Sequence, residues 1–108
     1  LFTFITIDNG MLTFRSSTFQ TMIKIPEEFQ DKIPNHLLIY AEMINAYRDW
    51  EQNTILCFDI KTNSSSEKSD YSIRWNRMKN IVTEFIVPIL DRSEIPWIMA
   101  QIFSKPFL

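Results

Sequence analysis

Glycine, cysteine and histidine are each nearly absent from this sequence, and each scarcity excludes a class of site. The 108 residues contain one Gly, one Cys and one His. A phosphate-binding loop or a dinucleotide fingerprint needs two or three glycines, because the backbone must approach the anion closely. A single cysteine, Cys57, excludes an internal disulfide and any zinc site built from several cysteines. We therefore expect no metal site and no small-molecule cofactor.

Long hydrophobic runs and a strong net charge are also lacking. No run approaches the roughly 20 apolar residues of a membrane-spanning helix, and the formal net charge of -2 creates no strong field toward nucleic acid or anionic membrane. The hydrophobic content of 45% nevertheless indicates a folded chain. The free cysteine predicts a reducing intracellular compartment, either cytoplasm or nucleus. The length of 108 residues predicts a single domain. Because the sequence does not begin with Met, we expect it to be a segment of a longer polypeptide or a processed one.

The lone glycine predicts a β-hairpin at the N-terminus. Residues 1–7 and 11–15 alternate bulky and β-branched side chains, and Asn9-Gly10 stands between them. This dipeptide is the strongest short hairpin signal, because both turn positions require a positive φ. Phe2 and Phe4 are expected on one face and the neighbouring isoleucines on the other. Both faces are apolar, so we expect both to be covered, by this domain or by a partner.

The remaining pattern predicts two further strands and two main helices. Segments 19–25 and 54–62 are typical of strands, and the apolar start of the second indicates a central position in the sheet. An apolar stripe predicts a helix over 36–52 that begins after Asn35. A second stripe predicts a helix over 71–87 that Pro88 either kinks or stops near Val87.

Two segments complete the organisation. The serine-rich segment 63–70 is expected to be a flexible loop. Segment 95–103 fits either a helix or a strand, with the helix favoured. The order of elements predicts an α+β fold, in which an N-terminal hairpin and further strands form a mostly antiparallel sheet with the two helices on one face.

One short motif suggests catalysis. Asp59-Ile60-Lys61 ends the best predicted strand. It resembles the acidic-x-Lys strand end of restriction-endonuclease-like nucleases, in which the carboxylate binds Mg²⁺ and the lysine activates water. The resemblance implies at least one further carboxylate, for which Glu42, Asp49 and Glu51 are the candidates. An ordinary solvated strand end is the competing interpretation, and a catalytically dead relative is a third.

A cluster of cations suggests a second site. Arg74, Arg77 and Lys79 accompany Trp75 on the predicted 71–87 helix, a combination that binds phosphates and stacks on bases in nucleic-acid-binding proteins. A solvated basic face explains the same residues, and the overall acidic balance favours that explanation.

Aromatic excess points to a third kind of surface. Aromatic residues make up 14% of the chain, and aromatic and Met side chains are enriched at interfaces. We expect a partner to bind a set of such side chains on the hairpin and the first predicted helix, namely Phe2, Phe4, Tyr40, Met43, Tyr47 and Trp50. The sequence thus predicts a non-enzymatic protein-protein interaction or assembly module, bound to another protein chain or another segment of its parent. The metal-dependent nuclease is the alternative.

Overall fold

The computed structural model describes residues 2–44, 53–62, 70–93 and 98–102, which form one sheet and a layer of helices. The sheet order is β3-β2-β1-β4-β5-β6, and every neighbouring pair is antiparallel except β5 and β6. The strands are β1 (Phe2–Asp8), β2 (Met11–Arg15), β3 (Gln20–Lys24), β4 (Leu37–Ile44), β5 (Asn53–Thr62) and β6 (Ile98–Ile102).

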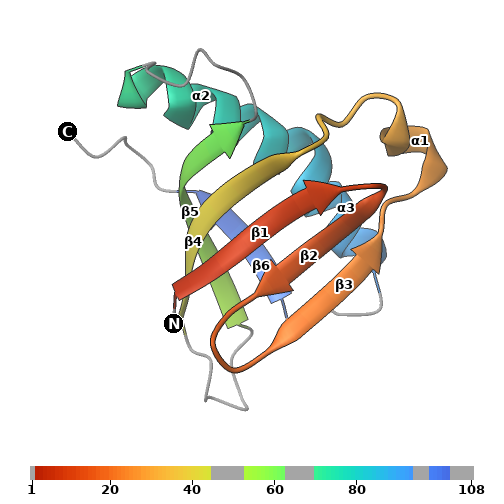
Figure 1. Cartoon of the computed structure of the whole chain (residues 1–108), viewed down its shortest axis with the longest axis horizontal. Coiled ribbons are helices and arrows are strands. Elements are labelled where there is room, and N and C mark those ends of the chain that lie inside the picture. The colour runs from red at the N-terminus through yellow and green to blue at the C-terminus, as the bar shows by residue number, and fades with distance from the viewer. Residues whose placement is uncertain (1, 45–52, 63–69, 94–97, 103–108) are drawn as a thin grey trace.

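The helices form the second layer, behind the sheet in Figure 1. The long helical segment runs without a break through α2 (Tyr71–Ile81), the π-helical turn η1 (Val82–Ile86) and α3 (Val87–Arg92), while α1 (Glu27–Gln30) is a single turn. Among the described residues no helix lies over the face of the sheet turned toward the viewer in Figure 1. The predicted α+β class, with its mostly antiparallel sheet, is confirmed.

The predicted hairpin is confirmed. Asn9 and Gly10 both have positive φ, at 50° and 77°, so they form the two-residue turn that fits the twist of an antiparallel pair. Asp8 pairs with Met11 at the end of the ladder. On β1, Thr3, Ile5 and Ile7 are buried beneath the helices. Phe2 and its alternate neighbours lie on the other face, as the period of two requires.

The predicted helix over 36–52 is wrong where the structure describes it. Leu37–Ile44 is strand β4, and residues 45–52 lie outside the described residues. The same apolar residues fit a period of two as well as a period of 3.6, since burial alternates from Leu37 through Met43. Pairing with β1 on one side and β5 on the other decides for the strand. Asn35 is not a helix cap, because its side chain accepts a hydrogen bond from the Asn9 backbone N–H.

The C-terminal segment also corrects an expectation. Its described part, Ile98–Ile102, is strand β6 and not the favoured helix, and it pairs in parallel with the start of β5. Pairing with β5 therefore makes this segment a strand, although its local pattern also fits a helix. The predicted strands over 19–25 and 54–62 appear as β3 and β5. Most of the predicted flexible loop over 63–70 lies outside the described residues.

The predicted helix over 71–87 is confirmed, but it does not end near Pro88. In an α-helix the ring of Pro88 would collide with the carbonyl of residue 84. Here the chain widens into the π-helical turn η1, in which the Val87 N–H donates to the Val82 carbonyl, and the helix continues to Arg92. None of the described helices is long and apolar enough to cross a membrane.

The hydrophobic core lies between the helical layer and the covered face of the sheet. It joins β-strand residues such as Phe14, Ile39 and Ile55 to helical residues such as Met78 and Ile86, each fully buried. Every strand side chain in this core stands on the helix-facing side of the sheet.

Candidate functional site

The open face of the sheet is built from cross-strand rows that the register defines. One row contains Phe2, Glu42 and Leu56. The next contains Gln20, Arg15, Phe4, Tyr40 and Asp59, and the third contains Met22, Thr13, Thr6, Leu38 and Lys61. An antiparallel sheet with one solvated face normally carries polar side chains on that face. The first two rows instead contribute aromatic rings.

Four rings, those of Phe2, Phe4, Tyr40 and Phe58, form what we call the aromatic patch. Phe2 and Phe4 meet edge to face, with ring centroids 4.8 Å apart. Phe4 lies 5.9 Å from Tyr40, and Phe2 lies 6.2 Å from Phe58. Such pairs contribute about 0.5–1.5 kcal/mol each beyond simple burial. The rings therefore hold one another in place, although Phe2 remains 45% exposed.

Two hollows border the aromatic patch. The larger, of about 400 Å³, lies against Phe2, Phe4 and the β2–β3 turn at Ser16 and Ser17. The other, of about 260 Å³, lies between Phe4 and Leu38 and is bordered by Met22 on β3. Arg15 lines both hollows. The open face is thus an apolar surface with recesses of side-chain size.

The structure brings three of the six predicted partner-binding residues together and places a fourth on the other face of the sheet. Phe2, Phe4 and Tyr40 meet in the aromatic patch. Met43 is 3% exposed and lies in the core on the other face of the sheet, because a strand places it opposite to Tyr40. Tyr47 and Trp50 lie outside the described residues.

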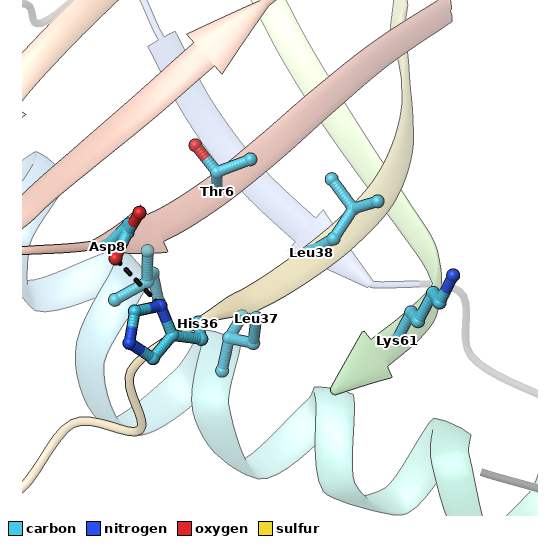
Figure 2. A pocket seen from close by; sticks show the side chains of 7 residues that line it. Thr6, Asp8, His36, Leu37, Leu38 and Lys61 are labelled. Carbon is cyan, nitrogen blue, oxygen red and sulfur yellow. Dashed lines mark ion pairs between the residues drawn. The ribbon is translucent and has the colours of Figure 1, made fainter. Parts of the chain in front are cut away.

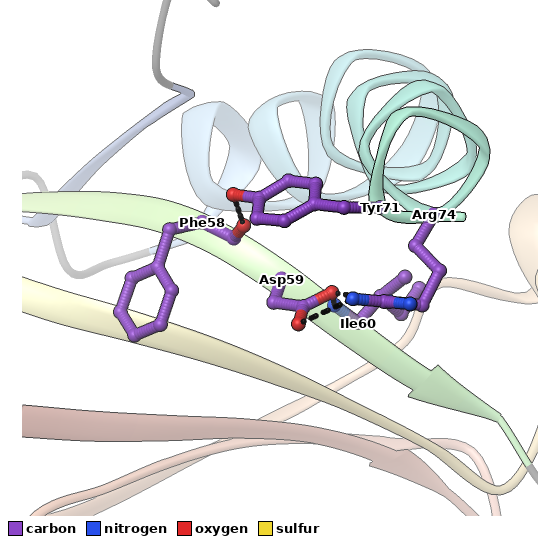
Figure 3. Close-up of polar contacts among 5 residues, drawn as sticks. All are labelled: Phe58, Asp59, Ile60, Tyr71 and Arg74. Atoms are coloured by element: carbon purple, nitrogen blue, oxygen red, sulfur yellow. Dashed lines mark hydrogen bonds and ion pairs between the residues drawn. The ribbon is translucent and has the colours of Figure 1, made fainter. Parts of the chain in front are cut away.

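Asp59, the centre of the nuclease alternative, is held by an arginine (Figure 3). The Arg74 Nε donates to Asp59 Oδ1 at 2.9 Å, and its Nη2 lies 3.4 Å from Oδ2. The Ile60 N–H donates to the same Oδ1 at 2.8 Å. Both carboxylate oxygens thus face a guanidinium, which occupies the position where a metal ion would approach.

The local cause is a β-bulge. The register passes from Tyr40 opposite Asp59 to Ala41 opposite Cys57, so Phe58 is the additional residue on β5 at this point. The extra residue interrupts the period of two along β5, so Cys57 and Asp59 do not share one face of the sheet. In Figure 3 the Phe58 ring points away from α2 while its carbonyl accepts a hydrogen bond from the Tyr71 hydroxyl. The bulge therefore places the ring of Phe58 in the aromatic patch.

Two other residues of the nuclease alternative, Glu42 and Lys61, lie in the rows on either side of the one that contains Asp59. Glu42 is half-buried in the first row, opposite Leu56, and Lys61 is exposed in the third row. Asp49 and Glu51 lie outside the described residues. Within the described ranges, no group of three or more acidic, His or Cys side chains could hold a metal ion.

A pocket of about 350 Å³, lined by both polar and apolar residues, lies at the far end of the open face (Figure 2). Asp8 and His36 stand on one side, with Asp8 Oδ1 2.9 Å from His36 Nδ1, and Lys61 stands on the other. His36 has a φ of 57°, which is costly for a residue with a side chain. Its contact with Asp8 ties the start of β4 to the end of β1, so these residues act in holding the hairpin turn.

The predicted nucleic-acid residues are partly engaged by neighbours. Arg74 pairs with Asp59 and lies over the Tyr71 ring, 5.4 Å from its centroid. Lys79 lies 5.6 Å from the centroid of Trp75, which is buried as part of the core. A phosphate would have to compete with these contacts for two of the three cations.

Sequence reasoning missed Phe58, Leu38 and Met22 as members of the open face. A period-two reading of 37–44 would have placed Leu38 beside Tyr40, but no sequence signal marks the bulge that turns Phe58 outward. Comparison of the chain with protein-family models, with curated proteins and with solved structures finds no match in any of the three.

Proposed function

We propose that this domain is a non-enzymatic protein-protein interaction module, and that its partner binds the open face of the sheet over the aromatic patch. The observation that carries the proposal is Phe2, which is 45% exposed and yet fixed among three other rings. The partner is another protein chain or another segment of the parent polypeptide.

The chemistry of the surface favours a protein partner. Aromatic, Met and Arg side chains are the types enriched at protein interfaces, and Met22 and Arg15 border the hollow beside Phe4. Rings that are already packed together lose little side-chain freedom when a partner covers them, so less of the contact energy is offset by ordering.

The polar residues around the patch would set orientation. Arg15 lies on the β2 side and Glu42 on the β4 side of the Phe2–Phe4 pair, as the register requires. Opposite charges on two sides of an apolar centre provide a polar rim, which mainly selects the partner and its orientation. The hollows beside Phe4 would accept the partner's apolar side chains.

The experiment compares two substitutions of equally exposed apolar residues. Phe2→Ser removes a ring of the aromatic patch, and Ile73→Ser removes a side chain that is 52% exposed on α2, in the other layer. We expect Phe2→Ser to weaken binding of a recovered partner protein at least about tenfold, as loss of a central aromatic does. Calorimetry with the purified partner measures the change, and Ile73→Ser should leave it unaltered.

A hydrophobic fluorescent dye gives a readout that needs no known partner. Dye fluorescence should fall for Phe2→Ser and persist for Ile73→Ser. The proposal is wrong if Phe2→Ser binds partner and dye as the unaltered chain does, or if Ile73→Ser alone abolishes both.

A further inference from the structure

Strand β3 ends the described sheet, and the direction of its backbone groups can be worked out from two hydrogen bonds. The Ser16 N–H donates to the Phe19 carbonyl at 3.0 Å, and the Ile25 N–H donates to the Gly10 carbonyl at 2.9 Å. Each bond connects an odd-numbered residue next to β3, either Phe19 or Ile25, to the β2 side of the sheet. Because hydrogen-bonding direction alternates along an antiparallel strand, Thr21 and Ile23 also bond toward β2.

The even-numbered residues therefore point their backbone groups outward. The N–H and C=O of Gln20, Met22 and Lys24 face away from β2, along the edge of the described sheet. Such a row is a template for another strand. The Met22 side chain, 53% exposed, stands at the middle of this row.

We propose that this edge pairs with the β3 edge of a second copy of the chain, antiparallel and centred on Met22. In this register Met22 stands opposite Met22 of the copy, and Gln20 stands opposite Lys24 of the copy. Each of these pairs exchanges two backbone hydrogen bonds. On the helix-facing side, Thr21 meets Ile23 of the copy, a pairing of two β-branched residues that sheets favour.

The side chains select this arrangement over its competitors. Parallel pairing would bring Lys24 beside Lys24 of the copy, and like charges at neighbouring positions are unfavourable. The antiparallel register centred on Met22 separates the two lysines and gives each a glutamine amide as its opposite. Pro26 follows in the outward-facing series and has no N–H to donate, which ends the pairing at Lys24.

The resulting contact is short and two-fold symmetric. A five-residue strand buries less surface than a standard protein interface, so we expect a transient dimer whose population rises between micromolar and millimolar concentration. The pairing would also join the open faces of two copies into one continuous surface. The inference does not rest on the proposed function, because it uses the backbone of β3 and not the aromatic patch.

Cysteine cross-linking tests the register directly. In a hydrogen-bonded antiparallel pair the opposed Cα atoms lie about 5.5 Å apart, within the range of about 4.4–6.8 Å that a disulfide spans. Met22→Cys should therefore form a disulfide-linked dimer under mild oxidation. Cys57 is fully buried and does not compete. Gln20→Cys and Lys24→Cys should each remain monomeric alone and cross-link when mixed.

Charge variants at two exposed positions, Gln20 and Lys24, give a second readout. Because the Gln20 Oε1 accepts a hydrogen bond from the Arg15 Nε of the same chain, circular dichroism checks that each variant keeps the fold. Gln20→Glu should tighten self-association and Gln20→Lys should weaken it, each by roughly two- to thirtyfold, since two cross-strand pairs of about 0.2–1 kcal/mol change per dimer. Adding Lys24→Glu to Gln20→Lys should restore it. Sedimentation equilibrium over a concentration series measures these constants.

Any of three results would overturn the proposal. The first is a Met22→Cys chain that stays monomeric under oxidation while its thiol remains reactive. The second is equal self-association of the Gln20→Glu and Gln20→Lys chains. The third is equal cross-linking of Gln20→Cys alone and of the Gln20→Cys with Lys24→Cys mixture.

Discussion

Cys57 and Asp59 stand two residues apart on β5 and meet opposite surroundings. Cys57 is fully buried on the helix-facing side, and this burial raises the pKa of its thiol from an ordinary 9.0 to about 12, because the thiolate cannot be solvated there. Asp59 is a quarter exposed and faces the guanidinium of Arg74. Position, and not residue type, thus makes one side chain chemically inert and the other part of an ion pair.

Cys57 should make the stability of the fold fall at alkaline pH. The unfolded thiol releases its proton above about pH 9, whereas the folded thiol keeps it until about pH 12. The unfolded state therefore binds fewer protons in this window, so the free energy of unfolding decreases as pH rises through it and is unaffected below pH 9 by this group. The expected loss is about 1 to 2 kcal/mol at pH 10.

Urea unfolding of the unaltered chain and of Cys57→Ala at pH 8 and at pH 10 measures this loss. The difference in unfolding free energy between the two chains should become smaller at pH 10, because only the unaltered chain loses the contribution of Cys57. The other titrating groups are present in both chains, so their contributions cancel. A difference that is the same at both pH values would contradict the prediction. Thiol reagents should likewise label the native chain far more slowly than the chain in denaturant.

At the scale of elements, α2 contacts β5 directly beyond the described pairing with β6. That pairing runs from Asn53 to Cys57 on β5, and Tyr71 and Arg74 contact the bulge at Phe58 and Asp59. Side chains of the helix thus take over polar groups that a neighbouring strand would otherwise satisfy. Helix α1 is attached in a similar way, through the Arg92–Glu28 ion pair and the edge-to-face contact of Phe29 with Phe85.

Removing the Arg74 side chain should loosen the attachment of α2 to β5. We expect Arg74→Ala to lower the free energy of unfolding by about 1 kcal/mol, a value that allows for the partial exposure of the pair. Arg74→Lys should recover part of that loss, since it keeps the charge without the two-point contact.

A double-mutant cycle with Asp59→Ala isolates the pair. The two substitutions should be clearly less than additive in chemical denaturation, and Arg77→Ala, one turn further along α2, should combine additively with Asp59→Ala. Full additivity of Arg74→Ala and Asp59→Ala would show that the ion pair does not hold the helix.

At the scale of the whole molecule, the sheet has one face that forms the core and one that the described helices leave open (Figure 1). Both faces carry large apolar side chains, so composition does not distinguish them. The arrangement of the helices does, because it converts one set of side chains into core and leaves the other available for a partner.

Two methionines offer a matched test of this division. Met43 on β4 is 3% exposed, and Met22 on β3 is 53% exposed. Met43→Ala should lower the free energy of unfolding by about 2–4 kcal/mol through lost burial and a new cavity, whereas Met22→Ala should change it by less than about 1 kcal/mol. Chemical denaturation measures both, and equal losses would refute the assignment of Met43 to the core.

The local parts of the fold could be predicted from the sequence. Asn9-Gly10 specifies a turn because few residues accept a positive φ, and the apolar run of β5 is too β-branched and too continuous for another element. The stripe that includes Trp75 and Met78 fits a helix and no strand. In each case the preference is contained within a few neighbouring residues.

The candidate site could be predicted in part, for the same reason. Phe2 and Phe4 share a face because alternation along one strand guarantees it. The prediction of Tyr40 as a partner-binding residue depends on a helix where the structure has strand β4, and this strand places Met43, predicted together with it, in the core. Phe58 joins them through a bulge that depends on the pairing of β4 with β5.

By itself the sequence determined the hairpin, the long C-terminal helix, the α+β class and the absence of any glycine-built phosphate site. Tertiary structure alone decided that 37–44 and 98–102 are strands, that Asp59 faces Arg74, and which face of the sheet stays open. The physical reason is that local preferences act between neighbours in the chain, whereas strand pairing and burial stabilise contacts between residues far apart. A segment whose local pattern is ambiguous adopts the structure that the long-range contacts stabilise more.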